Sequence, residues 1–83
     1  MNKTLKWAIE QDPALIKYDG FDDCIIGICN RFGQESILAY DYEKIIRKLM
    51  LMGMERSEAV DFFEYNQIGM YVGERTPCFI ERP

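Results

Sequence analysis

The chain has 83 residues, a formal net charge of −4 and a hydrophobic content of 48%. This is enough for one small domain, but the chain lacks the basic excess that binding to nucleic-acid phosphates requires. The absence of histidine removes the commonest general base and the commonest metal ligand. No apolar run approaches the roughly 20 residues that span a bilayer, and no signal peptide precedes the three cysteines. We therefore expect a cytoplasmic protein with reduced thiols and no membrane partner.

Residues 1–19 are expected to form an N-terminal helical arm, and residues 20–83 a single α+β domain. Within the arm, the sequence TLKWAIEQ is typical of a short helix with Thr4 as its N-cap. We expect Trp7 to anchor this arm to the domain. Gly20, which lies between acidic residues, predicts a turn before the domain begins.

The apolar and β-branched segment CIIGICN, residues 24–30, predicts a strand. Both of its faces are apolar, which favours a central position in the sheet, and Gly27 is expected to leave space for a close neighbour. A turn around Gly33 then leads into a returning strand, SILAYD, at residues 36–41. Together the two segments predict a β-hairpin.

Residues 41–66 predict two helices joined by a short turn. Asp41 is a good N-cap, apolar residues then recur every three or four positions, and Gly53 is expected to end the first helix. The second helix is expected to begin at Glu55 or at Ser57, since either residue could cap it. Because the connection is short, the two helices should pack as an αα-hairpin.

An irregular segment with two glycines follows, and PCFIE is expected to be the last strand. Because proline cannot donate a hydrogen bond to a neighbouring strand, we expect either that this strand lies at the sheet margin or that Pro77 is its first residue. The predicted fold is therefore α+β: a β-hairpin, an αα-hairpin and a final strand in the order ββααβ, after a short N-terminal helical arm.

Several separated signatures occur in order along the chain: Tyr40–Asp41–Tyr42 with Lys44, Gly53–Met54 with Glu58–Ala59, Tyr65–Asn66, and Tyr71 with Gly73–Glu74 and Thr76–Pro77. They resemble the Y-D-Y-x-K-I-I, G-M-x-x-x-E-A, Y-N and Y-x-G-E-x-T-P pattern of a family of small uncharacterised proteins common in bacteriophage and prokaryotic genomes. The resemblance covers about residues 20–81, with Glu55 replacing the usual Ser or Thr cap. It implies a phage or prokaryotic source and a compact α+β domain, but no activity.

Leu51 and Met52 are candidate binding residues at the end of the first helix of the pair. Leu51 lies roughly 100° around the helix from Met50 and from Met52, so the three cannot face one core. They could form an adaptable docking surface, and the alternative is that the methionines fill the core. A symmetric homodimer through this turn would cover the surplus apolar surface, as would an N-terminal arm that folds back over it.

The second group of candidate binding residues lies in and beside the loop of residues 66–77, and consists of Tyr65, Asn66, Tyr71 and Glu74. The loop glycines would allow a ligand to approach the backbone. In the alternative interpretation Tyr71 packs and Glu74 ties the loop to its neighbours.

We predict no catalytic residue, no metal and no cofactor. The aspartates at positions 19, 22 and 23 match no calcium-loop spacing, and three cysteines without a fourth ligand favour buried thiols over a zinc site. The first functional hypothesis is a phage-encoded binding or inhibitor protein that acts on a host protein, in host takeover or anti-defence. The alternatives are a carboxylate-dependent metal hydrolase, which would use Asp22, Asp23 and Glu74, and a nucleic-acid-binding accessory protein, which would use Lys44, Arg47, Lys48 and Arg56.

Overall fold

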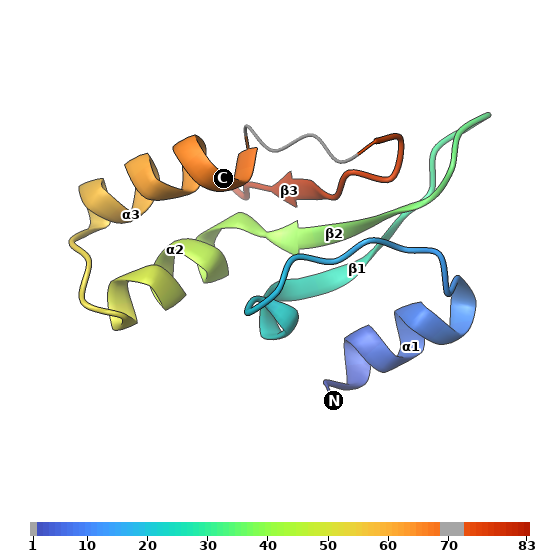
Figure 1. Cartoon of the computed structure of the whole chain (residues 1–83), viewed down its shortest axis with the longest axis horizontal. Helices are drawn as coiled ribbons and strands as arrows, with labels where there is room; N and C mark the ends of the chain where they lie inside the picture. Colours follow the sequence, from blue (N-terminus) through green and yellow to red (C-terminus); the bar gives the residue numbers. More distant parts are fainter. Residues whose placement is uncertain (1, 69–72) are drawn as a thin grey trace.

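The structure is a computed structural model that describes residues 2–68 and 73–83 (Figure 1). Its main elements are α1 (Lys3–Gln11), β1 (Ile25–Cys29), β2 (Ile37–Asp41), α2 (Tyr42–Leu51), α3 (Arg56–Phe63) and β3 (Cys78–Ile80). A short 3₁₀ turn, η1 (Asp22–Cys24), precedes β1, and a π-helical turn, η2 (Glu64–Ile68), continues α3. This mixture of helices and strands confirms the predicted α+β class. Among the described residues, no helix is both long and apolar enough to cross a membrane.

The three strands form one sheet in the order β1-β2-β3, with β1 antiparallel and β3 parallel to β2. The helical pair α2–α3 is therefore the crossover that joins the two parallel strands, and β2 lies at the centre with all five residues buried. The prediction of a central first strand was wrong, because β1 is at the edge. The close neighbour expected at Gly27 is also absent among the described residues, since a Cβ added there would meet nothing within 4 Å.

Local capping signals place α2 and α3 where the sequence predicts them. The Asp41 carboxylate accepts a hydrogen bond from the Lys44 amide at 3.2 Å, as expected of an N-cap. Gly53 has φ 107°, the left-handed conformation that glycine adopts most readily after a helix. The backbone amide of Glu55, just before α3, donates to the Glu58 carboxylate at 3.4 Å. These contacts set the short turn of the helical hairpin.

The core lies between one face of the sheet and the helices. Leu38 and Tyr40 from β2 belong to the same buried cluster as Ile45, Ile46 and Phe63. Aromatic rings join the layers, because the Phe79 ring lies 4.8 Å from that of Phe63 and 5.8 Å from that of Tyr40, between centroids. Aromatic pairs at these separations stabilise the fold by more than the burial of their apolar area alone would contribute.

Helix α1 contributes to this core, but not through the residues expected. Its N-cap is Asn2 rather than Thr4, since the Asn2 side chain accepts from the Leu5 amide at 3.0 Å. Leu5 and Ala8 are buried in the common cluster, whereas Trp7 is 46% exposed and does not anchor the arm.

Candidate functional site

Two strongly exposed apolar side chains lie at the turn that joins α2 to α3, at the end of the molecule away from the β-hairpin tip (Figure 1). Leu51 is 88% exposed, Met52 is 69% exposed and Met50 is 38% exposed, while Leu49, two residues before Leu51, is 1% exposed. The prediction that the three residues 50–52 cannot face one core is therefore confirmed. Helix α1 lies against β1 instead, so the alternative in which the arm covers this patch is wrong.

A groove of about 570 Å³ runs beside α2 next to this turn. It is lined by Asp23, Cys24, Lys44, Arg47, Lys48, Leu51 and Met52. Apolar groups of Leu51 and Met52 meet three cationic side chains there, with a single carboxylate among the lining residues. Such a groove suits a ligand that combines an apolar anchor with negative charge.

The three cations of the groove are not equally available. Lys48 forms an ion pair with Asp23 at 2.7 Å, and this hydrogen bond lowers the pKa of Asp23 and raises that of Lys48. Arg47 lies 3.8 Å from Glu43. The Glu43 carboxylate, however, accepts hydrogen bonds from the two terminal guanidinium nitrogens of Arg56, at 2.7 and 2.9 Å. Arg47 therefore keeps most of its capacity to bind an anion. Lys44 forms no ion pair within the described part of the chain, so it too is available.

The thiol that lines the groove is not a nucleophile at neutral pH. Burial, followed by the negative charge of Asp23, raises the pKa of Cys24 to about 11. A thiol with such a pKa is almost fully protonated near pH 7. Cys24 therefore contributes a small apolar surface to the groove rather than reactivity.

Tyr65 and Asn66 lie in η2, at the far end of α3 from the turn that carries Leu51. Tyr65 is 89% exposed, whereas the Asn66 side-chain amide donates to the Phe62 carbonyl at 2.9 Å and helps to close the end of α3. The eight residues of α3 span about 12 Å, so this pair does not meet the Leu51 patch directly.

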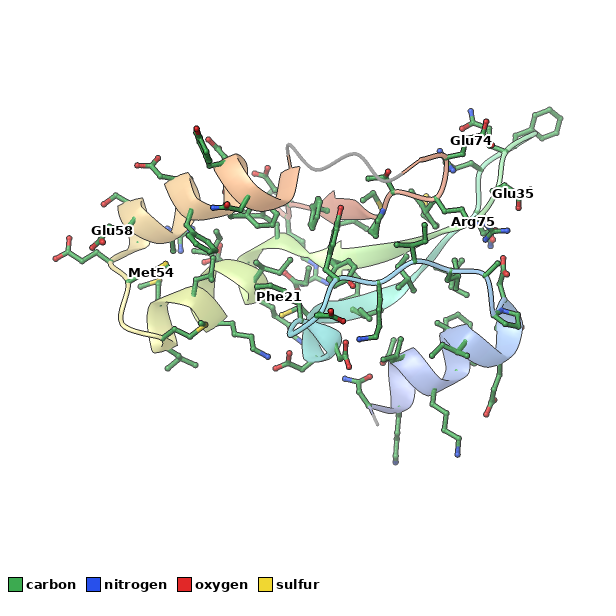
Figure 2. All side chains as sticks on the ribbon, viewed as in Figure 1. Phe21, Glu35, Met54, Glu58, Glu74 and Arg75 are labelled. Atoms are coloured by element: carbon green, nitrogen blue, oxygen red, sulfur yellow. The ribbon has the colours of Figure 1, made fainter. Side chains whose placement is uncertain are left out.

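Glu74 belongs to a third region, beside the tip of the β-hairpin, and Figure 2 shows it at the opposite end of the molecule from Met54 and Glu58. Its carbonyl accepts from Arg31 at 2.8 Å, which ties the loop to the β-hairpin. Neighbouring Arg75 holds Asp12 at 2.8 Å and also pairs with Glu35. These contacts tie the loop to the β-hairpin and to the end of α1, beside a cavity of about 660 Å³ that Glu74 lines. The fourth loop candidate, Tyr71, lies outside the described residues.

The carboxylates of the hydrolase hypothesis are not assembled into one site. Asp22 and Asp23 lie in η1, where they pair with Lys17 at 3.2 Å and with Lys48 at 2.7 Å, while Glu74 is at the β-hairpin end. In the part of the chain that the structure describes, no group of three His, Cys, Asp or Glu residues could hold a metal ion. The grouping predicted for metal hydrolysis is therefore wrong.

The sequence analysis treated as separate two sets of candidate residues that line the same groove in the structure. It assigned the cations of residues 44–48 to nucleic-acid binding and Leu51 to docking. Positions 44, 47, 48 and 51 follow the i, i+3, i+4, i+7 spacing of one helix face, so this spacing could have united them. It also missed Phe62, which is 40% exposed on α3.

No protein-family model, curated protein or solved structure matches this chain in comparisons with known proteins. The resemblance drawn from the sequence signatures therefore stays an expectation.

Proposed function

We propose that the protein is a small binding module that acts by docking onto another protein. Its docking surface consists of Leu51, Met52 and the cationic groove residues Lys44, Arg47 and Lys48. The protein's effect on its partner would come from occupying a surface of that partner rather than from chemistry on a substrate.

The observation that carries the proposal is the 88% exposure of Leu51. A leucine left in water forgoes about 1.5–3 kcal/mol that its burial would contribute. Met50 and Met52, which flank it, are 38% and 69% exposed, and flexible thioether side chains adapt to varied apolar partners. Leu51 and Met52 both line the cationic groove, and an exposed apolar patch rimmed by polar residues is the kind of surface that marks protein–protein contacts.

The resemblance to a phage and prokaryotic family supports a biological setting for this binding. In that setting the partner is a host protein, and the result of binding is host takeover or anti-defence. A short chain that binds and blocks a host protein needs no catalytic group of its own. The nucleic-acid alternative receives less support, because Asp23 and Glu43 neutralise part of the cationic face.

Affinity capture with a matched pair of surface variants tests this function. Leu51→Glu places a charge in the docking surface, while Phe32→Ser removes an equally exposed apolar side chain at the β-hairpin tip, where Phe32 is fully exposed. Tagged wild-type protein and both variants would be compared by quantitative mass spectrometry of proteins captured from bacterial lysate.

The proposal predicts a protein that is enriched by the wild type and by Phe32→Ser but lost with Leu51→Glu. The same order must hold when the purified partner is titrated by calorimetry. Capture that is unchanged by Leu51→Glu would contradict the proposal, as would equal loss with both variants.

A further inference from the structure

We infer that the partner segment held by the docking surface is an acidic, amphipathic helix, which seats an apolar side chain against Leu51 and places carboxylates on Arg47 and Lys44. This inference rests on the proposed function and deepens it, because it names the chemistry of what binds there. The observation behind it is the distribution of free and engaged charge around the groove beside α2.

The groove has two walls, and one ion pair connects them. Asp23 and Cys24 come from η1, and the remaining lining residues come from α2 or directly follow it. Lys48 of α2 holds Asp23 of η1 at 2.7 Å. Each charge of this pair already has its partner, so the ligand is selected by other side chains of the groove.

Two cations of the groove remain for a ligand. Lys44 and Arg47 are exposed, and Lys44 has no ion pair among the residues that the structure describes. Arg47 has Glu43 at 3.8 Å, but that carboxylate is taken up by Arg56. Both cations also line a second cavity, of about 560 Å³, at the N-terminal end of α2. They therefore form the shared border of two cavities, where an anionic group can approach them from either side.

The apolar anchor lies at a fixed distance from these cations. Leu51 is four residues after Arg47 and seven after Lys44, so all three lie on one face of α2. With the rise of an α-helix, Leu51 is about 6 Å along the axis from Arg47 and about 10 Å from Lys44. A partner helix with the same pitch that places an apolar residue on Leu51 meets the two cations with carboxylates four and seven positions away. Helices bound in grooves are recognised through anchors at such spacings.

Charge separates this ligand from the alternatives. A basic segment would meet Lys44 and Arg47 with charge of the same sign, which opposes binding. A nucleic acid is held through many phosphate contacts and has no apolar anchor for Leu51, whereas the groove offers two free cations. The protein carries a net charge of −4, so an acidic segment is drawn to this face and repelled by most of the remaining surface.

Selection from a displayed library of random peptides of about 16 residues, long enough to form a helix, tests this chemistry. The full-length chain is the bait, and a parallel selection on Leu51→Glu identifies the peptides that need Leu51. These peptides are synthesised with a fluorescent label, and anisotropy measures their affinities for the wild type and for Arg47→Glu. Arg47→Lys keeps the charge, and Lys6→Glu reverses an exposed cation of α1 that does not line the groove. Circular dichroism shows whether each variant is folded.

Peptides that need Leu51 should carry an apolar residue with Asp or Glu four and seven positions to one side. Arg47→Glu should weaken their binding about tenfold, because charge pairs at an interface carry coupling of this order. Arg47→Lys should weaken it less, and Lys6→Glu should leave it within about threefold of the wild type. Changing the peptide carboxylate four positions from the anchor to Gln should weaken binding to the wild type but not to Arg47→Glu, as expected of a direct pair.

Peptides that need Leu51 but are basic or uncharged would overturn the inference, and so would a selection that yields no such peptides. Affinities that ignore Arg47→Glu would do the same. A random-sequence oligonucleotide that binds the wild type and Leu51→Glu alike would assign the cations to nucleic acid, which also overturns the inference.

This inference and the proposed function fail separately. If a protein is captured from lysate through Leu51 while the selected peptides lack acidic residues, only the acidic chemistry of the ligand is contradicted. If acidic peptides bind through Leu51 and Arg47 but no protein is captured through Leu51, only the proposed function is contradicted.

Discussion

The inner and outer faces of the helical hairpin show how this small chain divides its apolar residues. On the inner face, Ile45, Ile46 and Phe63 are at most 1% exposed and pack against the sheet. On the outer face, Leu51 and Tyr65 are almost fully exposed. The difference indicates that the inner face supplies stability and that the outer face is free to serve binding. Predictions about each face can separate these two roles.

The largest expected effect on stability comes from the inner face. Phe63→Ala removes a ring that is fully buried and lies 4.8 Å from the Phe79 ring and 5.2 Å from the Tyr42 ring, between centroids. We expect a loss of about 3–5 kcal/mol in the free energy of unfolding, measured by urea denaturation. The matched variant Tyr65→Ala should change it by less than about 0.5 kcal/mol. Equal effects would remove the distinction between the faces.

A smaller effect is expected where β2 passes into α2. Asp41→Ala removes the N-cap bond to Lys44 and the 2.7 Å ion pair with Arg82. The loss of the cap should cost about 1–2 kcal/mol in the free energy of unfolding. Arg82→Ala keeps the cap and removes the exposed partner, so it should cost clearly less. If the two variants were equally unstable, the cap would not be the important contact.

The same carboxylate predicts how stability depends on pH. Burial by itself would raise the pKa of Asp41, but the hydrogen bond from Lys44 and the charge of Arg82 outweigh burial and lower it. Because the folded pKa is below the unfolded one, this contribution is present above about pH 4 and is lost as pH falls through the folded pKa. Urea titrations at decreasing pH should show a loss of stability that is shallower in Asp41→Asn. An equally steep loss in that variant would contradict the assignment.

A single buried hydrogen bond gives a still smaller effect. The Tyr40 hydroxyl accepts from the Tyr18 amide at 2.9 Å, beneath the N-terminal segment that crosses the sheet. Tyr40→Phe keeps the ring contacts but removes this acceptor, so we expect a loss of about 1 kcal/mol in the free energy of unfolding. Hydrogen exchange of the Tyr18 amide should quicken more than exchange in α3. Unchanged protection of that amide would contradict the role of this bond.

The smallest effect on stability is expected at the docking surface. Leu51→Glu should alter the free energy of unfolding by less than about 0.5 kcal/mol, because its side chain is already 88% exposed. Urea denaturation of this variant and of the wild type at the same low concentration measures the difference. A loss as large as that of Phe63→Ala would assign Leu51 to the core and leave the outer face without its proposed role.

The elements that the sequence predicted well are set by neighbouring residues. Asp41 caps a helix that starts at the next position, and Gly53 ends it within two residues, so the signal and the structure are adjacent. The position of β1 at the sheet edge is different. Two apolar faces favour a central strand, but the order of strands depends on where β3 returns after the α2–α3 crossover. No local pattern contains that information.

The candidate site could be predicted only in part, again because local spacing carries no information on contacts between residues that are distant in the sequence. Helical spacing alone places Leu51 away from the core side of α2, and the structure agrees. Spacing could not reveal that Asp23 lies beside Lys48, since these residues are 25 positions apart and meet only in the folded chain. Nor could it separate Tyr65 from Glu74, which share one segment of sequence but lie in different regions of the fold.

Site-specific photo-crosslinking tests most directly whether the outer face of the hairpin is the binding surface. A photoreactive phenylalanine analogue would be placed at Leu51 and, as a control, at Phe32, which is equally exposed at the other end of the molecule. After irradiation of the protein in bacterial cells, the account predicts discrete crosslinked species from position 51, formed with another protein or with a second copy, and none from position 32. The same pattern from both positions, or no discrete product from position 51, would contradict it.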